Sequence, residues 1–298
     1  MFTLSIIIPF YKGENYIGKV VSSIRAASCN EAIDYEMIVI IDSPESDVGV
    51  VTDLVKSSSK GDTNIKSLKI LSNNQNIGVA ATRNRGLSIA QGEYLYCIDQ
   101  DDAVEEDFFK VIVPLFHQKK DLILLNGLVS YTHRPKVHRI YYLHPRLAMK
   151  NIVLDDIVRS PGQLIFSRKV TRNLKYPVPE KNFGSDDKFF LILVMLENPG
   201  MQVTYVDQPV YHACIHHENY SHDRIRLQLS SLELWDHLQT ITNTTSIKNY
   251  INRNKRYLKF SARSRLHLTA KEWLLGLREA LWYFTRPNKI VRYLIKHS

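Results

Sequence analysis

The chain has 298 residues, of which 44% are hydrophobic and 23% charged, so it can bury one large core in one elaborated domain or in two small ones. Three widely separated cysteines exclude an even disulfide framework and a cysteine-based metal site, and they favour a reducing cytoplasm. The first residues lack a basic signal-peptide region, and no apolar run approaches the roughly 20 residues of a spanning helix. We therefore expect a chain that is neither secreted nor transmembrane.

Basic residues outnumber acidic ones, 39 Lys and Arg against 30 Asp and Glu, which gives a net charge of +9. Such an excess favours an anionic partner: nucleic acid, a phosphorylated ligand or an anionic lipid surface. The excess is uneven, because the segment 248–298 contains Glu272 and Glu279 as its only acids. The basic charge belongs mainly to the C-terminal part of the chain.

From residue 4 to residue 128, short apolar runs alternate with stretches of helical spacing. The predicted strands are Leu4–Ile8, Glu36–Ile41, Ile65–Leu71, Tyr94–Ile98 and Asp121–Leu125. The predicted helices between them are Tyr16–Ala27, Val48–Ser58, Val79–Ala90 and Glu105–Phe116. Nearly continuous apolar strands that alternate with helices indicate an α/β fold with a mostly parallel sheet covered on both faces.

The pattern beyond residue 128 is less regular. We predict a hairpin arm over Lys136–Leu143, a strand over Gln163–Ser167 and a helix over Asp187–Leu196. After His222 the apolar residues have helical spacing, and Arg286-Pro287 divides the last stretch in two. A helical C-terminal region is the expectation.

Polar residues follow the predicted strands at the points where a doubly wound sheet binds its ligands. Pro9-Phe10-Tyr11 follows the first strand, Asp42 the second, and Asp99-Gln100-Asp101-Asp102 the fourth. Three carboxylates within four residues repel one another unless solvent or a cation neutralises them, and a hard divalent metal ion suits them. The alternative is an exposed acidic turn that caps the helix beginning near Glu105.

The segment Asn73–Gly86 places a polar, glycine-containing turn before a helix. Backbone donors at such a helix start, with Arg83 or Arg85, suit an anion such as a diphosphate. The segment has neither the Gly-x-Gly-x-x-Gly dinucleotide fingerprint nor a P-loop Gly-Lys-Ser/Thr, which argues against NAD enzymes and P-loop NTPases.

With these residues, the chain resembles family 2 glycosyltransferases over about residues 3–215. Four segments match in the family's order: Ser5–Tyr11, Glu36–Asp42, Asn76–Gly86 and Gly92–Asp102. The resemblance implies a Rossmann-like GT-A fold. It also implies a catalytic domain over 1–222, with a nucleotide-sugar half over 1–128 and an acceptor and catalytic-base half over 129–222, followed by a helical region over 223–298.

The resemblance also implies roles for single residues. Those expected at the nucleotide-sugar donor are Pro9, Tyr11, Asp42, Asn76, Gly78, Arg83, Asp99 and Gln100. In the Asp-x-Asp motif, Asp101 would be the main ligand of Mn or Mg, with Asp99 beside it. Asp102 would support the metal ligands or cap a helix. The general base of inverting transfer would be Asp187, with Asp186 as the second choice, although both also suit a plain helix start.

One departure from the family's pattern follows the second strand. Members commonly have Asp-Asp-Gly-Ser-x-Asp there, whereas this chain has Asp42-Ser43-Pro44-Glu45-Ser46-Asp47 and lacks the second acid and the glycine. The missing acid and glycine affect the expected contact between this segment and the nucleotide base. UDP, the commonest nucleotide of such enzymes, is the nucleotide we expect.

Four histidines lie in Tyr211–His222, but no cysteine pair or His-Glu-x-x-His frame supports a zinc site. The resemblance implies that a histidine of this segment, His216 or His217, reaches the diphosphate or the metal. The alternative is that both are surface histidines.

The C-terminal region combines aromatic, aliphatic and basic residues in a pattern typical of a helix on an anionic bilayer. These residues are Lys271, Trp273, Leu274, Leu277, Arg278, Leu281, Trp282, Phe284, Arg286, Lys289, Ile290, Arg292, Tyr293, Leu294, Ile295 and Lys296. The alternative is a helix packed on the catalytic core or on a dimer partner, with its basic face in solvent.

The resemblance implies a metal-dependent, inverting hexosyltransferase that takes a nucleotide sugar and a glycan or lipid-linked acceptor, as in bacterial lipopolysaccharide or capsule synthesis. It would be cytoplasmic and peripheral on the inner face of the cell membrane. Two rivals are a sugar-phosphate nucleotidyltransferase, whose Gly-rich, Arg-containing signature is missing after the first strand, and a non-catalytic module that binds anionic polymer or membrane. Nucleic acid is disfavoured, because Asp99–Asp102 would repel a phosphate backbone.

Overall fold

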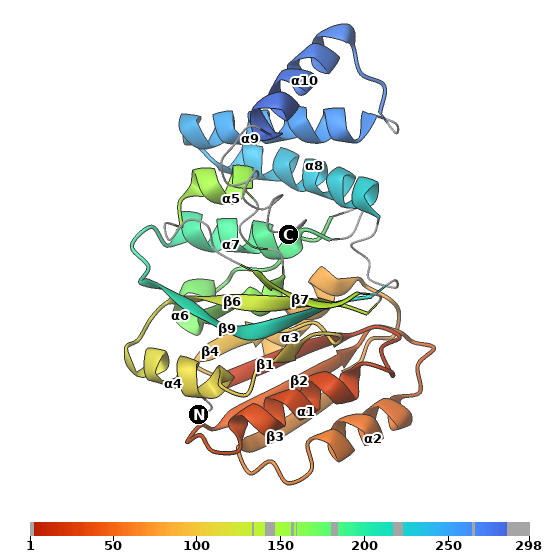
Figure 1. Cartoon of the computed structure of the whole chain (residues 1–298), viewed down its shortest axis with the longest axis vertical. Helices are drawn as coiled ribbons and strands as arrows, with labels where there is room; N and C mark the ends of the chain where they lie inside the picture. Colours follow the sequence, from red (N-terminus) through yellow and green to blue (C-terminus); the bar gives the residue numbers. More distant parts are fainter. Residues whose placement is uncertain are drawn as a thin grey trace. The chain divides into compact units, whose positions relative to one another are not determined.

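The computed structural model describes residues 3–132, 134–140, 147–155, 158, 160–179, 184–216, 223–263 and 266–284. By their contacts the described residues form two compact units (Figure 1). The first unit draws on Met1–Tyr141, Arg159–Tyr176 and Leu193–His217, and the second on Tyr142–Val158, Pro177–Ile192 and Glu218–Ser298.

The first unit is built on a sheet of nine strands in the described residues, with the order β3-β2-β1-β4-β8-β6-β9-β5 and with β7 paired to β6. The strands are β1 (Leu4–Phe10), β2 (Tyr35–Ile41), β3 (Ile65–Ser72), β4 (Tyr94–Cys97), β5 (Ala103–Val104), β6 (Leu122–Tyr131), β7 (Arg134–Ile140), β8 (Leu164–Ser167) and β9 (Val203–Ile215). Strands β3, β2, β1 and β4 pair with one another in parallel, and β6 pairs with β9 in parallel. The pairs β4–β8, β6–β8, β6–β7 and β5–β9 are antiparallel, so the whole sheet is mixed.

Helices follow most strands. They are α1 (Ile17–Ser28), α2 (Val48–Ser58), α3 (Val79–Ile89), α4 (Phe108–His117), α5 (Met149–Asp155), the 3-10 helix η1 (Pro161–Gln163), α6 (Arg168–Thr171), α7 (Asp186–Glu197), α8 (Arg224–Ile241), α9 (Thr245–Ser261) and α10 (Ala270–Phe284). The α/β fold class is confirmed, and the predicted first four strands and helices are present with ends shifted by at most three residues. The predicted hairpin arm is β7, although residues 141–143 and the break at Arg286-Pro287 lie outside the described residues.

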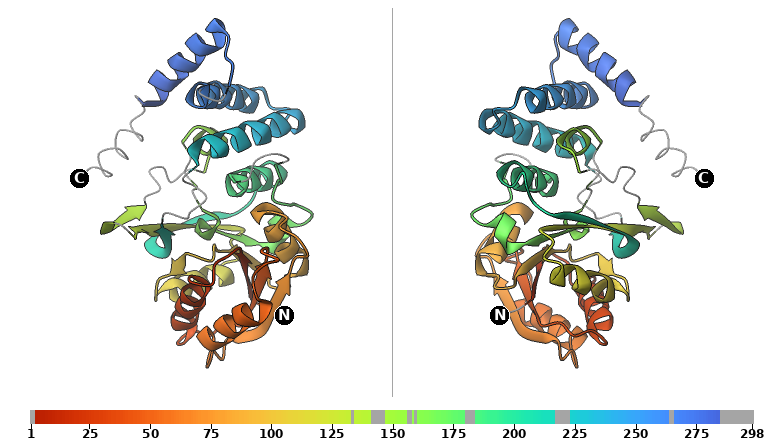
Figure 2. Two further views of the ribbon diagram at one scale, coloured as in Figure 1. Left: turned by 90° about the vertical axis from the view of Figure 1, so that its right-hand side faces the viewer. Right: turned by 90° about the vertical axis from the view of Figure 1, so that its left-hand side faces the viewer.

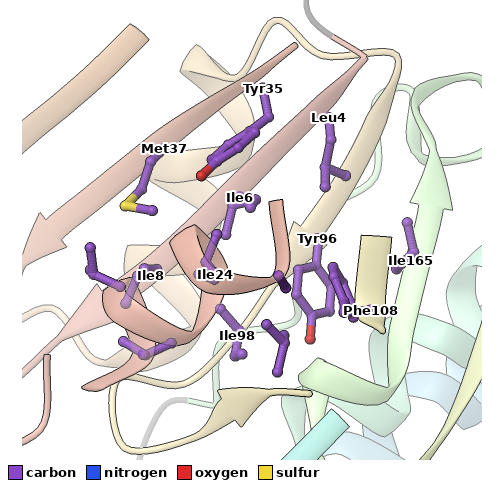
Figure 3. Close-up of a cluster of buried hydrophobic side chains, with 14 of the residues drawn as sticks. Leu4, Ile6, Ile8, Ile24, Tyr35, Met37, Tyr96, Ile98, Phe108 and Ile165 are labelled. Carbon is purple, nitrogen blue, oxygen red and sulfur yellow. The ribbon is translucent and has the colours of Figure 1, made fainter. Parts of the chain in front are cut away.

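Alternate residues of β1 and β2 face opposite sides of the sheet, and both sides are buried. Figure 3 shows one side, where Leu4, Ile6 and Ile8 pack with Ile24 of α1 and Phe108 of α4. Each such side chain, when fully buried, contributes about 1.5–3 kcal/mol to folding. This apolar layer holds the parallel strands in place and thereby fixes their carboxyl ends.

The other side of the sheet is covered by α3 at very close range. A Cβ atom on Gly86 would lie 2.4 Å from Cγ2 of Ile7, so the helix approaches β1 only because this residue is glycine. Gly92 is equally confined, since its Cβ would lie 2.5 Å from the backbone nitrogen of Ser5. These contacts explain why two glycines of the family-like segments are glycines.

The second unit is helical. Trp235 of α8 is fully buried and packs on Phe189 of α7, with ring centroids 4.3 Å apart. Asn254 of α9 donates to the carbonyl of Val153 in α5 over 2.6 Å. Figures 1 and 2 show α9 between α8 and α10. No helix among the described residues is long and apolar enough to cross a membrane.

Candidate active site

The carboxyl ends of β2, β1 and β4 meet at one edge of the sheet, because these three strands are adjacent and parallel. Gln100 joins two of these ends. Its side-chain oxygen accepts from the Tyr11 backbone N–H over 2.8 Å, and its side-chain nitrogen donates to the Tyr11 carbonyl over 2.8 Å. We expected Gln100 to bind the donor, but its amide group holds the Tyr11 backbone. Tyr11 itself is 45% exposed, whereas Pro9 is buried inside β1.

Asp42 is buried and shapes the loop that precedes α3. One of its carboxylate oxygens accepts from the Asn73 side chain over 2.7 Å and from Ile77 N–H over 2.9 Å, and the other accepts from Gly78 N–H over 2.8 Å. Gly78 has φ +83°, which favours glycine, and it also donates to the exposed Asn76 side chain over 3.0 Å. The loop is therefore built around the Asp42 carboxylate.

The two arginines of α3 have different partners. Arg83 is buried, and its guanidinium donates to the Asp99 carboxylate over 2.6 Å. Arg85 instead donates to the Ser72 carbonyl over 2.7 Å and to the side chain of Asn73. Of the two arginines predicted to bind an anion, Arg83 lies at the acidic segment. Arg85 instead stabilises the end of β3.

Asn84 fixes the position of a ring beside Arg83. Its side chain donates to the Tyr176 carbonyl over 2.8 Å and accepts from Tyr176 N–H over 2.7 Å. The Tyr176 ring centroid lies 5.6 Å from the Arg83 guanidinium, within the range of a cation–π contact. Neither Asn84 nor Tyr176 was predicted, because their contact joins positions 92 residues apart.

Asp101 lies beside His216 of the segment that follows β9. The distance from His216 Nε2 to the Asp101 carboxylate is 2.9 Å, and both groups are mostly buried. Burial, followed by the charge of Asp99, raises the pKa of Asp101, and the hydrogen bond with His216 opposes that rise. Tyr16 stacks on the His216 ring with centroids 4.4 Å apart. The structure thus brings His216 to the acidic segment, while His217 lies outside the described residues.

Asp102 connects the acidic segment to β9 through hydrogen bonds. It accepts hydrogen bonds from the Tyr211 hydroxyl and, over 3.0 Å, from Cys214 N–H, so it ties the acidic segment to β9. Burial and then the charges of Asp99 and Asp101 raise its pKa well above the ordinary range. It does not cap a helix, because α4 begins only at Phe108.

The side chains at the acidic segment that could bind a metal have the chemistry that suits a hard divalent cation, but they are few. Asp99 and Asp101 offer carboxylate oxygens whose mutual repulsion a cation would relieve, and His216 adds a nitrogen. Among the described residues no group of three or more His, Cys, Asp or Glu side chains is arranged to hold a metal. Of the other histidines in Tyr211–His222, His212 pairs with Glu105 over 2.9 Å.

The acids proposed as general base open α7 in the second unit. Asp186 is 2% exposed, whereas Asp187 is half-buried. The two preceding residues, Gly184 and Ser185, both have positive φ, +102° and +63°. Such a turn is strained for serine, and α8 stabilises it, because Ser230 donates to the Gly184 carbonyl over 2.8 Å.

Comparisons with known proteins concern the family and the fold of the chain. Residues 5–175, more than half of the chain, match the family model described as Glycosyl transferase family 2. The chain is 24% identical to the putative glycosyltransferase EpsH of Bacillus subtilis, over 72% of this chain and 61% of the relative. It is 31% identical to the poly(ribitol-phosphate) beta-N-acetylglucosaminyltransferase TarP of Staphylococcus aureus, over 67% of this chain and 59% of the relative. The match thus spans less than two thirds of either relative.

Solved structures with low sequence identity share the fold. S. aureus TarS 1-349 in complex with UDP-GlcNAc has a TM-score of 0.64 at 16% identity, covering 95% of this chain and 80% of that one. The mannosyltransferase PcManGT from Pyrobaculum calidifontis, in complex with GDP-Man and Mn2+, has a TM-score of 0.58 at 14% identity, covering 99% and 84%. The mixed sheet with its flanking helices is the GT-A fold, and the chain belongs to glycosyl transferase family 2.

Proposed function

We propose that the chain is an inverting hexosyltransferase that moves a sugar from a UDP-sugar to a hydroxyl of a glycan or lipid-linked saccharide in bacterial surface-polysaccharide synthesis. The observation that carries this proposal is the acidic segment at the end of β4, where Asp99 pairs with Arg83 and Asp101 with His216. The family membership supports transfer of a sugar, the UDP-GlcNAc complex of TarS supports UDP, and the name of TarP supports a surface polymer.

The donor would lie over the carboxyl ends of β1, β2 and β4. Tyr11 presents an exposed ring at the end of β1, which suits stacking on a base. Asp42 acts by holding the Asn73–Gly78 loop, since both of its oxygens accept hydrogen bonds from that loop. Arg83 supplies a cation close to Asp99. These residues orient the donor and stabilise its negative charge.

Asp101 and Asp99 would hold Mn or Mg together with the donor diphosphate. His216, which follows β9, would be a further ligand. A bound divalent ion would stabilise the negative charge that develops on the departing nucleoside diphosphate. Burial and then the charge of Asp99 raise the pKa of Asp101, and a bound cation would offset both effects, which supports this assignment.

Asp187 is the proposed general base. It would take the proton of the acceptor hydroxyl while that oxygen attacks the anomeric carbon and the bond to the diphosphate oxygen breaks. One displacement of this kind inverts the anomeric configuration. Asp187 is preferred over Asp186 because a general base must reach the acceptor, and Asp186 is almost wholly buried.

Hydrolysis of UDP-sugars tests the proposal without knowledge of the acceptor. The intact chain with Mn or Mg should release UDP from one sugar of a panel, and the first free sugar from an α-linked donor should be the β-anomer by NMR. Asp187→Asn should lower the hydrolysis rate about a hundredfold or more and leave the affinity for UDP unchanged. Asp186→Asn, the matched neighbour, should keep most of the rate.

Two outcomes would contradict the assignments. Full activity of Asp187→Asn would remove this residue as the base, and release of the α-anomer would remove inversion. Failure of every nucleotide sugar to bind with either metal would overturn the transferase proposal itself.

A lipid-linked acceptor would place the enzyme at the inner face of the cell membrane.

A further inference from the structure

Helix α10 has two chemically different faces. Gly276 turns inward against α9, where a Cβ atom would lie 2.5 Å from Cβ of Phe260, and Ala280 on the same side is buried. Leu274 and Leu281 are seven residues apart and therefore lie on one face of the helix, where they are 62% and 61% exposed. The helix therefore packs tightly on α9 with its small residues and leaves Leu274 and Leu281 exposed.

Both acids of α10 are neutralised within the second unit. Glu279 is buried and pairs with Arg253 over 2.9 Å and Arg256 over 3.3 Å, both from α9, and with Arg278 of α10 itself over 3.1 Å. Glu272 pairs with Lys259 of α9 over 3.3 Å. The negative charge of α10 is thus directed to the basic side of α9 and is absent from the face with the leucines.

Basic residues flank the exposed leucines. Lys271 is exposed, and Arg278 has 67% of its side chain exposed. Trp273, on the other flank, is 42% exposed. We define the α10 surface as Lys271, Trp273, Leu274, Leu277, Arg278 and Leu281. It combines an apolar stripe, a tryptophan at one edge and cations at the other, as in helices that lie in a lipid interface.

We propose that the α10 surface docks on an anionic lipid bilayer, with the leucines and Trp273 among the acyl chains and with Lys271 and Arg278 at the headgroups. Charge complementarity selects this partner, because the surface offers cations and no acid. A second copy of the chain fits less well. Antiparallel α10 helices related by a two-fold axis would bring Lys271 and Arg278 against the same residues of the other copy.

This inference specifies the membrane partner of the proposed transferase, but its test is independent of that function. Vesicle binding can succeed while every nucleotide sugar fails to bind, and the reverse also holds. The two proposals therefore fail separately.

Cosedimentation of the full chain with vesicles provides the test, using phosphatidylcholine, phosphatidylglycerol and an equal mixture. The wild type should bind in proportion to phosphatidylglycerol, and added salt should weaken binding. Lys271→Glu with Arg278→Glu should lower the affinity for phosphatidylglycerol about tenfold or more. Leu274→Glu with Leu281→Glu should do the same.

Matched controls come from the first unit. Val48 and Val50 of α2 are 43% and 49% exposed, and Lys110 of α4 and Lys169 of α6 have 71% and 80% of their side chains exposed. Val48→Glu with Val50→Glu, and Lys110→Glu with Lys169→Glu, therefore make the same changes in charge elsewhere. Both controls should bind vesicles like the wild type. All variants should keep the wild-type circular dichroism spectrum and melting temperature within error, which separates lost binding from lost folding.

Tryptophan fluorescence locates the contact. The emission of the wild type should shift to the blue on phosphatidylglycerol vesicles, and Trp273→Phe should lose most of that shift while it retains binding. Of the other two tryptophans, Trp235 is already fully buried, and Trp282 is stacked on Arg253 of α9, with its ring centroid 3.7 Å from the guanidinium. The proposal is overturned if the wild type binds no vesicle, or if the α10 variants bind like the controls. It is also overturned if sedimentation velocity shows self-association that Leu274→Glu with Leu281→Glu abolishes.

Discussion

Asp42 and Asp101 follow two strands on either side of β1, yet their surroundings differ. The Asp42 carboxylate is buried and accepts hydrogen bonds from one side chain and two backbone amides. Asp101 lies beside another carboxylate, Asp99, and its pKa is raised by burial and by that neighbour. A carboxylate saturated by its own loop stabilises the fold, whereas we propose that Asp101, beside another carboxylate, binds a ligand.

Asp102 shows that position in the motif does not decide the role. It is adjacent to Asp101, but the Tyr211 hydroxyl and Cys214 N–H bind its two oxygens, so it belongs with Asp42. The hydrogen-bond partners of a carboxylate, rather than its place in the sequence, therefore separate the acids that stabilise the fold from the one proposed to bind the metal.

The largest expected effect is on turnover at Asp101. Asp101→Asn should lower the rate of UDP-sugar hydrolysis about a thousandfold, or roughly 4 kcal/mol of barrier, because it removes the main metal ligand. Its melting temperature should not fall, since the change relieves repulsion with Asp99. A rate within tenfold of the wild type, or a clear loss of stability, would place Asp101 with the fold-building acids.

Asp42→Ala should show the opposite pattern, with stability as the main loss. Three donors of the Asn73–Gly78 loop would lose their acceptor, so the free energy of unfolding should fall by about 3 kcal/mol in urea denaturation. The isosteric Asp42→Asn keeps one acceptor oxygen and should lose less. Unchanged stability of the alanine variant would show that the loop does not depend on this carboxylate.

The smallest effect sharpens the comparison at Arg83. Asn84→Ala removes the two hydrogen bonds to the Tyr176 backbone, and we expect the donor KM to rise about three- to fivefold with kcat nearly unchanged. Asn84→Asp keeps the acceptor for Tyr176 N–H and should recover part of the affinity. If kcat falls as much as kcat/KM, Asn84 has a role beyond positioning.

The sequence predicted the parallel half of the sheet because local periodicity encodes it. Helix α2 matches its predicted bounds, and β1 and β2 differ by at most two residues. Strand β5 was missed, since two residues, Ala103 and Val104, carry no periodic signal and pair with β9 from more than a hundred residues away.

The candidate site was predictable in part. The family-like segments identified Asp99, Asp101 and Arg83, and the histidine-rich segment drew attention to His216. The stack of Tyr16 on His216 joins positions 200 residues apart, and no local pattern marks it. The roles of Gln100 and Asp102 were equally hidden, because a side chain's partners depend on which strand ends become neighbours. The roles proposed for these residues, the base assignment to Asp187 and the domain limits at 222 and 223 stay predictions.

Calorimetric titration of UDP, with and without Mn2+, into the wild type and Asp101→Asn tests the central claim most directly. The account predicts that Mn2+ strengthens UDP binding to the wild type about tenfold or more and leaves the variant's affinity unchanged. Equal strengthening in both proteins, or none in the wild type, would contradict the assignment of Asp101 as the ligand that joins metal and donor.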